Sequence, residues 1–466
     1  MGADTQRKSK GDFSQGSIAS NVLRMAGPMT LAQIITVLYN IVDRMYIGRL
    51  PDVGRLALTG IGICAPAISV IIAFANLCGI GGGPLFSQAR GRGDKEEAGS
   101  IMGNAFGMLL IFGVLLTASS LIVQEPLLYW LGADETTFPY AKQYFSVYLF
   151  GIITVMISLG MNPFVNAQGS SNYGMMTVAI GAIVNIILDP ILIFGLKMGV
   201  KGAALATVIA QTISALWVLL FLTRKNALVQ LQIHKMRLQG RLVGKIAALG
   251  ASGFMLSFTN SLVQRLYNTQ LRELGGTMYV SVMTIINSVR DIVFAGVNGL
   301  TSGASPVVAY NYGAKKYERV RETIRFVTIG SLIYCVIVWA VIQWKPEFFI
   351  RIFNSDPEMI PIGTHCFHVY FACIFAMGLQ LTGQMVSMAL GRAKTAMFFS
   401  LLRKVILVAP LIFILPRVFN LGVDGVLMAE PISNVVGGLA CYLTMYFSVY
   451  RGVLRKLEDR SPDLPG

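Results

Sequence analysis

Long apolar runs separated by short polar segments dominate this chain of 466 residues. A helix of about 20 apolar residues crosses the hydrocarbon core of a bilayer, and runs of that length recur along the whole sequence. They predict twelve transmembrane helices at residues 22–48, 58–86, 99–123, 140–165, 175–195, 202–223, 243–268, 279–307, 325–344, 362–388, 396–416 and 426–449. The first run continues far beyond the apolar core of a signal peptide, so we expect it to be retained. The predicted fold class is therefore an all-α polytopic membrane protein.

Composition supports the same class, because 54% of the residues are hydrophobic and only 13% are charged. That balance excludes an ordinary soluble globular protein. The six cysteines lie mostly within apolar runs and show neither close-spaced metal pairs nor a disulfide framework, so we assign them no chemistry. The formal net charge of +15 comes largely from basic residues in short segments between spans, as topology signals do. We therefore expect no nucleic-acid partner.

Lysine and arginine are distributed unevenly between the two predicted sides of the membrane. The termini and the even-numbered loops hold 22 of them, whereas the odd-numbered loops hold nine. Cytoplasmic loops carry the excess of basic residues in membrane proteins. We therefore expect a multi-pass protein of the cell membrane with both termini in the cytoplasm.

An internal repeat is indicated by three pairs of similar segments. The pairs have offsets of 220, 223 and 222 residues: 83–95 with 303–315, 199–206 with 422–429, and 167–169 with 389–391. Such Gly- and Ala-rich matches are weak singly, but their near-constant offset predicts two lobes of six helices each. The lobes are parallel repeats, because six spans return the chain to the cytoplasmic side. Two such lobes around a central cavity are typical of an alternating-access transporter.

The repeat and the basic segment in the middle of the chain together predict the domain boundaries. We expect an N-terminal six-helix lobe at 1–225, a basic cytoplasmic linker at 226–241, a C-terminal six-helix lobe at 242–450 and a cytoplasmic tail at 451–466.

Polar residues inside the predicted spans are concentrated in the first lobe. Asn185 and Asp189 are four residues apart, so they share one face of a helix, and Pro190 can kink that helix. In a helical hairpin around the turn at 195–201, Thr207 lies at the same depth as Asp189, roughly 13 Å below the turn. Asp43 lies roughly 10 Å inside the outer end of the first span.

These four residues offer only oxygen and amide groups, which suit a proton or a hard cation such as sodium. Two nearby carboxylates cannot both stay charged in a low dielectric without a counter-ion, so one takes up a proton or the pair binds a metal ion. We therefore assign Asp43, Asn185, Asp189 and Thr207 to coupling with H⁺ or Na⁺, and expect no other cofactor. At the repeat offset Asp189 corresponds to about Leu411, so coupling is expected in the first lobe.

Structural interpretations of the same residues remain open. The Asn185 to Pro190 element can simply mark a kink, and Asp43 can pair with Arg44 near the membrane interface. Glu430 aligns with Thr207 in the repeat and either caps the start of the last helix, which we favour, or titrates as a second acid.

Arg290 and Asp291 are unusual because they lie inside the eighth predicted span, with Arg290 roughly 16 Å deep. They form either a local ion pair or a substrate-facing or gating group, and the sequence favours neither interpretation. That depth argues against simple snorkelling of the arginine.

Several of these elements together resemble the multidrug and toxic compound extrusion (MATE) family. The resemblance is carried by YNIVD at 39–43 followed by IGR at 47–49, NIILDP at 185–190, GVKGAALAT at 199–207 and YNYGA at 310–314. It covers nearly the whole chain and is closest to the prokaryotic branch with Tyr-Asn-x-x-Asp in helix 1. It implies two six-helix bundles in a V shape, and it implies that Asp43, Asn185, Asp189 and Thr207 form the family's first-lobe ion site. The acids that the other branch carries in helices 7 and 10 have no clear counterpart here.

The resulting prediction is a secondary active antiporter for multidrug and xenobiotic efflux, which exports amphipathic, cationic organic compounds in exchange for H⁺ or Na⁺. We expect no enzyme activity, because no metal-binding, nucleophile-elbow or phosphate-loop motif is present. The nearest alternative is a flippase for a lipid-linked glycan or another amphipathic lipid, which Arg290 favours. The expected partners are small organic molecules and the lipid bilayer, and we expect a monomer. Candidate residues of the substrate cavity are Tyr39, Asn40, Asn162, Met255, Phe258, Asn268, Asn287, Arg290, Asp291 and Met377.

Overall fold

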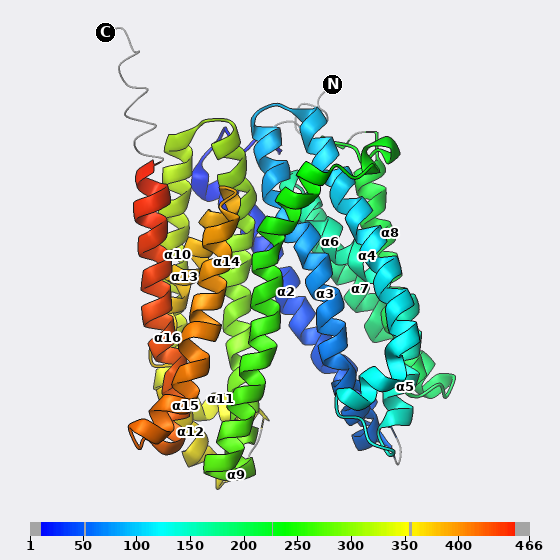
Figure 1. Ribbon diagram of the computed structural model, residues 1–466, viewed down its shortest axis with the longest axis vertical. Helices are drawn as coiled ribbons and strands as arrows, with labels where there is room; N and C mark the ends of the chain where they lie inside the picture. The colour runs from blue at the N-terminus through cyan, green and yellow to red at the C-terminus, as the bar shows by residue number, and fades with distance from the viewer. Residues whose placement is uncertain (1–10, 51–52, 226, 354–356, 453–466) are drawn as a thin grey trace. The chain divides into compact units, whose positions relative to one another are not determined.

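The computed structural model describes residues 11–50, 53–225, 227–353 and 357–452. Within these residues all regular structure is helical (Figure 1). The α-helices are α2 (Ile18–Gly48), α3 (Gly54–Gly91), α4 (Lys95–Trp130), α5 (Phe138–Phe150), α6 (Ile152–Ala167), α7 (Ser171–Pro190), α8 (Val200–Thr223), α9 (Gly240–Gly313), α10 (Tyr317–Trp344), α11 (Pro346–Phe353), α12 (Met359–Tyr370), α13 (Met377–Ala389), α14 (Ala393–Leu401), α15 (Ala409–Val418) and α16 (Gly422–Met445). Short 3₁₀ or π segments are η1 (Ile191–Gly195), η2 (Ile233–Met236), η3 (Ile374–Ala376), η4 (Leu402–Val408) and η5 (Tyr446–Tyr450). The all-α prediction is confirmed.

Each of the twelve predicted spans falls on a helical segment of the described chain. Among the residues that the structure describes, nine helices are long and apolar enough to cross a bilayer, and eleven spans result if each of two bent pairs counts as one. The bent pairs are α5 with α6, at 60°, and α12 with α13, at 42°. α9 covers two predicted spans, because its backbone leaves the helical region at Gly276, where φ is 80° and ψ is −170°. A residue with a side chain is strained at such a positive φ, so glycine joins the two helices of α9.

The chain divides into two compact units, which we call unit 1 and unit 2. Unit 1 contains Met1–Gln15 and Leu31–Phe254, and unit 2 contains Gly16–Thr30 and Met255–Gly466. The chain therefore passes from one unit to the other after Gln15, within α2 and again within α9. The predicted linker, 226–241, belongs to unit 1 and does not separate the units.

Unit 1 is built around α3, which packs against α4, α5 and α6, while α7 packs against α8. Its core includes Phe86 and Phe164, whose rings meet edge to face with centroids 5.5 Å apart. The segment η2 is fastened to α4, since Lys235 forms an ion pair of 2.8 Å with Glu96. This attachment explains why the basic linker groups with the first unit.

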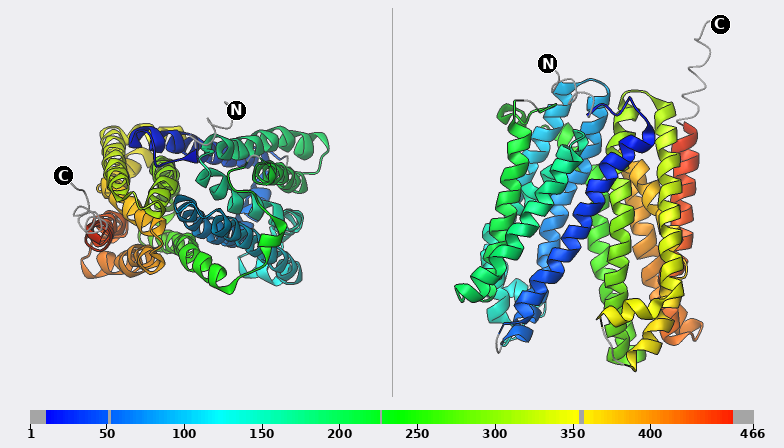
Figure 2. Two further views of the ribbon diagram at one scale, coloured as in Figure 1. Left: turned by 90° about the horizontal axis from the view of Figure 1, so that it is seen from above. Right: turned by 180° about the vertical axis from the view of Figure 1, so that it is seen from behind.

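Unit 2 contains a second bundle in which α16 packs against α13, α15 and η4 (Figure 2). Its core includes Tyr267, Phe367 and Tyr370, all nearly without solvent exposure. The segment Gly16–Thr30, which holds the first part of α2, completes this unit, and Arg319 donates a hydrogen bond of 2.9 Å to the carbonyl of Gly16.

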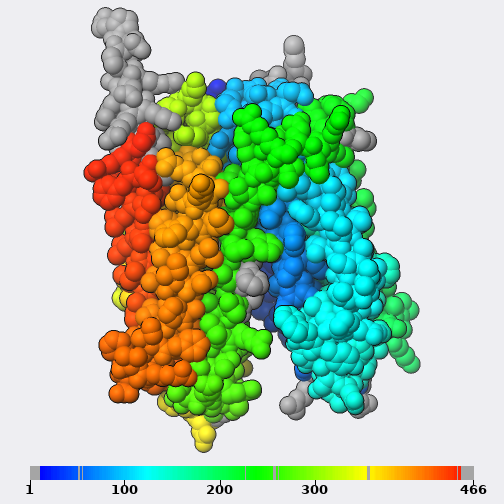
Figure 3. All heavy atoms as spheres, viewed as in Figure 1, coloured from blue at the N-terminus to red at the C-terminus, as the bar shows by residue number. Residues whose placement is uncertain are grey.

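Large apolar side chains are exposed along the outer faces of several helices. On α16 they recur at helical spacing, at Met428, Ile432, Val436, Leu439 and Leu443, and so form one stripe. Figure 3 shows the spheres of α14 to α16 in orange to red. An apolar stripe of this length would be unfavourable in water, but it matches the acyl chains of a lipid bilayer. The protein is therefore a multi-pass membrane protein.

Candidate ion-coupling site

The predicted site in unit 1 begins with a cluster on α7 and α8. Asn185 and Asp189 lie one helical turn apart on α7, and the Asn185 amide donates to Asp189 Oδ1 at 3.4 Å. The same amide nitrogen donates to Thr207 Oγ1 on α8 at 3.4 Å. The Thr207 hydroxyl in turn donates to the carbonyl of Ala203 at 3.1 Å. The hairpin predicted from the sequence thus brings these three side chains together.

Asp43 joins this cluster from α2. Residue 43 belongs to the part of α2 that is counted in unit 1, so the four predicted coupling residues lie within one compact unit. The Asp43 and Asp189 carboxyl groups lie within hydrogen-bonding reach of each other. Asp189 is 0% exposed and Asn185 is 3% exposed, whereas Asp43 and Thr207 are half-buried, so the α7 side of the cluster is shielded from solvent.

Three buried oxygen atoms of this cluster have no hydrogen-bond donor among the described residues. They are Asp43 Oδ1, Asn185 Oδ1 and Asp189 Oδ2. A buried acceptor without a donor costs roughly 1 to 3 kcal/mol, and more when the group is charged. The cluster is therefore suited to accept a proton or a hard cation, either of which would satisfy these oxygens. The described residues contain no group of three or more His, Cys, Asp and Glu side chains that could hold a metal ion, so amide and hydroxyl oxygens would complete a cation site.

A small cavity of about 60 Å³ adjoins the cluster. Asn185 and Thr207 line it, together with Tyr39 and Thr36 of α2 and Gln211 of α8. This volume accommodates a few water molecules or an ion but not an organic amphiphile. The cavity therefore has the size of an ion or a few water molecules, and Tyr39, predicted as a substrate contact, lines it beside the predicted coupling residues.

Two polar residues of this site were missed in the sequence. Tyr144 on α5 is buried, its hydroxyl lies within hydrogen-bonding reach of Thr207, and it is close enough to Asp43 for an electrostatic interaction. The apolar pattern around residue 144 gave no signal for this contact. Gln211 follows Thr207 by four residues and has a buried Oε1 without a donor in the described structure, so the helical spacing could have identified it.

The other predicted cavity residues divide between the two units. In unit 1, the Asn40 amide donates to the Thr36 carbonyl on its own helix, and the Asn162 amide donates to the Gly174 carbonyl at 3.1 Å. Unit 2 contains the remaining candidates, of which Asn287 and Met377 are buried and Met255 and Asn268 are half-buried. The side chain of Phe258 lies outside the described residues. The assignment of these residues to a substrate cavity stays a prediction.

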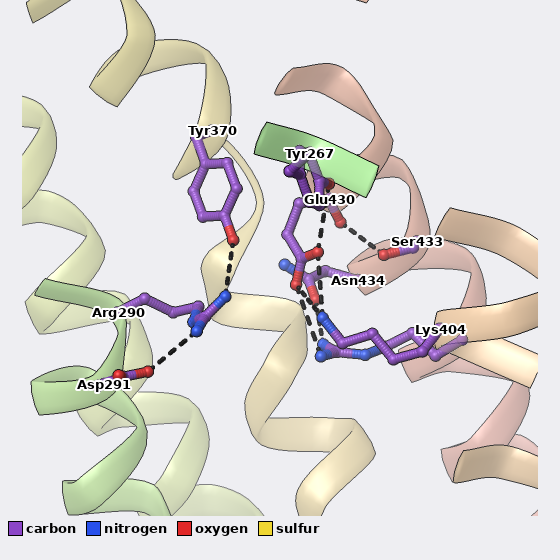
Figure 4. Close-up of polar contacts among 9 residues, drawn as sticks. Tyr267, Arg290, Asp291, Tyr370, Lys404, Glu430, Ser433 and Asn434 are labelled. Atoms are coloured by element: carbon purple, nitrogen blue, oxygen red, sulfur yellow. Dashed lines mark hydrogen bonds and ion pairs between the residues drawn. The ribbon is translucent and has the colours of Figure 1, made fainter. Parts of the chain in front are cut away.

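Unit 2 contains a second polar cluster, which the sequence analysis identified only in part (Figure 4). Glu430 does not cap the last helix, because it is the ninth residue of α16, and it is only 2% exposed. Instead its carboxylate accepts two hydrogen bonds from Lys404 Nζ, at 3.1 and 3.3 Å. Lys404 and its neighbour Arg403 were overlooked, although two consecutive cations within an apolar run are a clear signal.

Arg290 and Asp291 form the local ion pair that was one of their two interpretations. The Arg290 guanidinium donates to Asp291 Oδ1 at 3.0 Å and to the Tyr370 hydroxyl at 3.4 Å. The Asp291 side chain is 60% exposed, whereas that of Arg290 is 25% exposed. The pair therefore lies at the edge of the second cluster, with its acid toward the outside of unit 2.

Known proteins resemble this chain over nearly its whole length. The MatE family model matches it twice, at residues 28–191 and 253–414. Multidrug export protein MepA of Staphylococcus haemolyticus is 24% identical over 442 residues, which are 94% of this chain and 94% of that protein. MepA of Staphylococcus saprophyticus is also 24% identical, over 96% of this chain and 97% of that protein.

Solved structures show the same fold. A structure described as an outward-facing multidrug resistance MATE family transporter has a TM-score of 0.89 at 20% identity, covering 95% of this chain and 98% of that one. A MATE structure in a bent conformation has a TM-score of 0.88 over the same shares of the two chains. The two family matches together span well over half of the sequence. The chain therefore belongs to the MATE family of membrane efflux transporters and is a transporter, not an enzyme.

Proposed function

We propose that this protein is a secondary antiporter, which exports amphipathic organic cations in exchange for H⁺ or Na⁺ entering the cell. The observation that carries the proposal is the pair of Asp43 and Asp189 beside Asn185, each with one buried acceptor oxygen that lacks a donor in the described structure. The MepA relatives are named as multidrug export proteins, which supports organic compounds as the substrates. We place the protein in the cell membrane as a monomer, with both termini in the cytoplasm.

Ion binding would change the stability of α2, because Asp43 is on this helix and faces Asp189 on α7. Without an ion, two facing carboxylates repel each other in a low dielectric, and a proton or a sodium ion removes that repulsion. The ion can shift the transport cycle only by binding one conformation more tightly than the other. α2 is suited to transmit this difference, since its first part belongs to unit 2 and the rest belongs to unit 1.

The segment that follows Asp189 also favours a conformational response. Pro190 ends α7, and the chain continues as the π segment η1 up to Gly195. A proline and a π turn both interrupt the regular backbone hydrogen bonds of a helix. A change at Asp189 can therefore bend this helix at low cost.

The proposal is tested by efflux of a cationic dye from proteoliposomes, with proton and sodium gradients imposed separately. Asp189→Asn keeps the shape of the side chain but removes the titrating group, so we expect gradient-driven efflux to fall at least about tenfold. Glu135→Gln is the matched control, because it neutralises an exposed carboxylate in a loop of the same unit. Undiminished efflux by Asp189→Asn would refute the coupling assignment. Translocation of a lipid-linked glycan without dependence on either gradient would instead favour a flippase.

A further inference from the structure

The polar cluster of unit 2 has an unequal number of buried charges. Lys404 and Arg403 on η4 both reach Glu430 on α16, at N to O distances of 3.1 and 3.5 Å. Their side chains are 4% and 9% exposed, and that of Glu430 is 3% exposed. Two cations thus share one carboxylate in a solvent-shielded site.

The surrounding groups do not supply a second negative charge. Arg403 Nη1 donates to Asn434 Oδ1 at 2.6 Å, and the Tyr267 hydroxyl of α9 donates to Glu430 Oε2 at 3.5 Å. Arg403 Nε is buried without an acceptor among the described residues. Arg290 of α9 adds a third cation, which its own neighbour Asp291 neutralises. With every group in its ordinary ionised form, the cluster carries a net charge of +1.

A buried net charge is unfavourable, and the loss of one proton from the cluster would remove it. Arginine keeps its proton at any pH at which proteins are folded, and Glu430 gains from facing two cations. The Lys404 amine is the group whose proton can leave, because lysine changes charge readily when buried. Loss of that proton leaves Arg403 and Glu430 as a neutral pair, and the amine can still donate hydrogen bonds to Glu430.

We propose that Lys404, held between Glu430 and Arg403, is a second proton-exchanging site of this transporter, located in unit 2. The N–H bond of the ammonium breaks, the proton passes to water, and the neutral amine stays beside Glu430. Figure 4 shows two sets of polar contacts: Asp291 with Arg290 and Tyr370, and Glu430 with Tyr267 and Lys404.

Proton exchange by Lys404 follows from the cluster itself, whereas its part in transport rests on the proposed antiport. Lys404 differs from the carboxylates of unit 1 in the sign of its charge. Its site is neutral after proton release and positive after proton uptake. A cationic substrate is repelled by the positive form, so the protonation of Lys404 would weaken substrate binding near unit 2.

The test compares Lys404→Arg with wild type in an acid–base titration of the purified transporter. Arginine keeps the positive charge and the ion pair but cannot release a proton, so the variant should take up about one proton fewer per chain across the neutral pH range. Lys394→Arg is the matched control, since Lys394 is exposed on α14 and should leave proton uptake unchanged. Proton uptake by Lys404→Arg equal to wild type would overturn the inference.

A second variant provides an independent measurement in case Lys404→Arg does not fold. The variant Lys404→Gln leaves Arg403 and Glu430 as a neutral pair, and it should also lose the exchanging proton. Asp189→Asn should retain the Lys404 proton, because the two sites belong to different units. Active efflux by Asp189→Asn would refute the proposed function alone, whereas wild-type titration by both unit 2 variants would refute the lysine site alone.

Discussion

At the scale of single residues, Asp134 shows how one carboxylate organises a loop. It lies between α4 and α5, where its Oδ1 accepts from the hydroxyl of Thr136 at 2.7 Å and from the amide and hydroxyl of Thr137, both at 2.8 Å. These hydrogen bonds, first of all the one from the Thr136 side chain, lower the pKa of Asp134 to about 2. These hydrogen bonds therefore hold the backbone of the loop in place directly before α5.

We predict that Asp134→Ala accelerates hydrogen exchange at the amides of Thr136 and Thr137 roughly fivefold, as expected for a lost hydrogen bond. Because the pKa is lowered on folding, the stabilisation is complete above the ordinary pKa of aspartate and disappears as the pH falls through about 2. Protection in the wild type should therefore persist when the pH is lowered from about 7 to about 5. Hydrogen exchange followed by mass spectrometry of this loop measures both effects. Equal exchange in the variant and the wild type would contradict the prediction.

Some residues of the candidate sites could be predicted from the sequence, and others could not. Asn185, Asp189 and Thr207 could be grouped from the sequence, because helical spacing and a short turn fix their relative positions. Tyr144 and the pair of Lys404 with Glu430 could not, because they join helices that are distant in the chain, and no local pattern specifies which helices pack together. The role of Glu430 was therefore open in the sequence, and the capping interpretation that we favoured is wrong.

At the scale of elements, the close approach of α3 and α9 depends on glycine. A Cβ atom on Gly250 would lie 1.9 Å from the carbonyl oxygen of Leu77, and one on Gly81 would lie 2.1 Å from that of Ile246. Both distances are far too short for a side chain, so the two backbones are in direct contact. This contact joins the first part of α9 to unit 1.

We predict that Gly250→Ala destabilises the protein by about 1 to 3 kcal/mol, because the added methyl group must push the helices apart. Gly244→Ala is the control on the same helix, since a Cβ there has no neighbour within 4 Å. The control should be neutral or slightly stabilising, because alanine favours the helix more than glycine does. Thermal unfolding of the purified variants in detergent measures the difference, and equal midpoints for both variants would show that the close contact does not matter.

Helix positions were predictable from hydrophobicity, but helix shape was not. Each of the twelve predicted spans falls on helical structure, because burial in lipid requires about 20 apolar residues whatever the packing. The bend of 60° between α5 and α6 and the π segments lie inside continuous apolar runs, so hydropathy gives no sign of them. Such irregularities arise from packing against neighbouring helices, which a single run does not encode.

At the scale of the whole molecule, the internal repeat reappears in how the chain is partitioned. Besides the crossing after residue 15, the chain crosses between the units after residues 30 and 254, which are 224 residues apart. The two family matches start at residues 28 and 253, at nearly the same offset. The sequence predicted an offset of 220 to 223 residues but placed the boundary in the linker. The reason for the difference is that each unit takes the first turns of one long helix from the other half of the sequence.

This exchange of helix ends predicts how the protein responds to being divided. Cutting the chain at the linker gives 1–225, which lacks the α9 residues that pack on α3, and 227–466, which lacks the α2 residues of unit 2. In the intact protein Cβ positions on Gly299 and Gly303 would meet Thr30 and Ala26 at 2.0 and 2.5 Å, so this part of α2 is tightly packed. Neither fragment should be stable alone, whereas the two expressed together should copurify through a tag on one of them.

A fragment that ends at 254 provides the matched comparison. Residues 1–254 contain all of unit 1, including the glycine contact between α3 and α9. Expressed alone, this fragment should therefore give a higher yield and a higher unfolding midpoint in detergent than 1–225. If the unit boundary were only the linker predicted from the sequence, the additional residues would contribute nothing and the two fragments would behave alike. The comparison thus separates a protein made of two independent halves from one in which each half is completed by a helix end of the other.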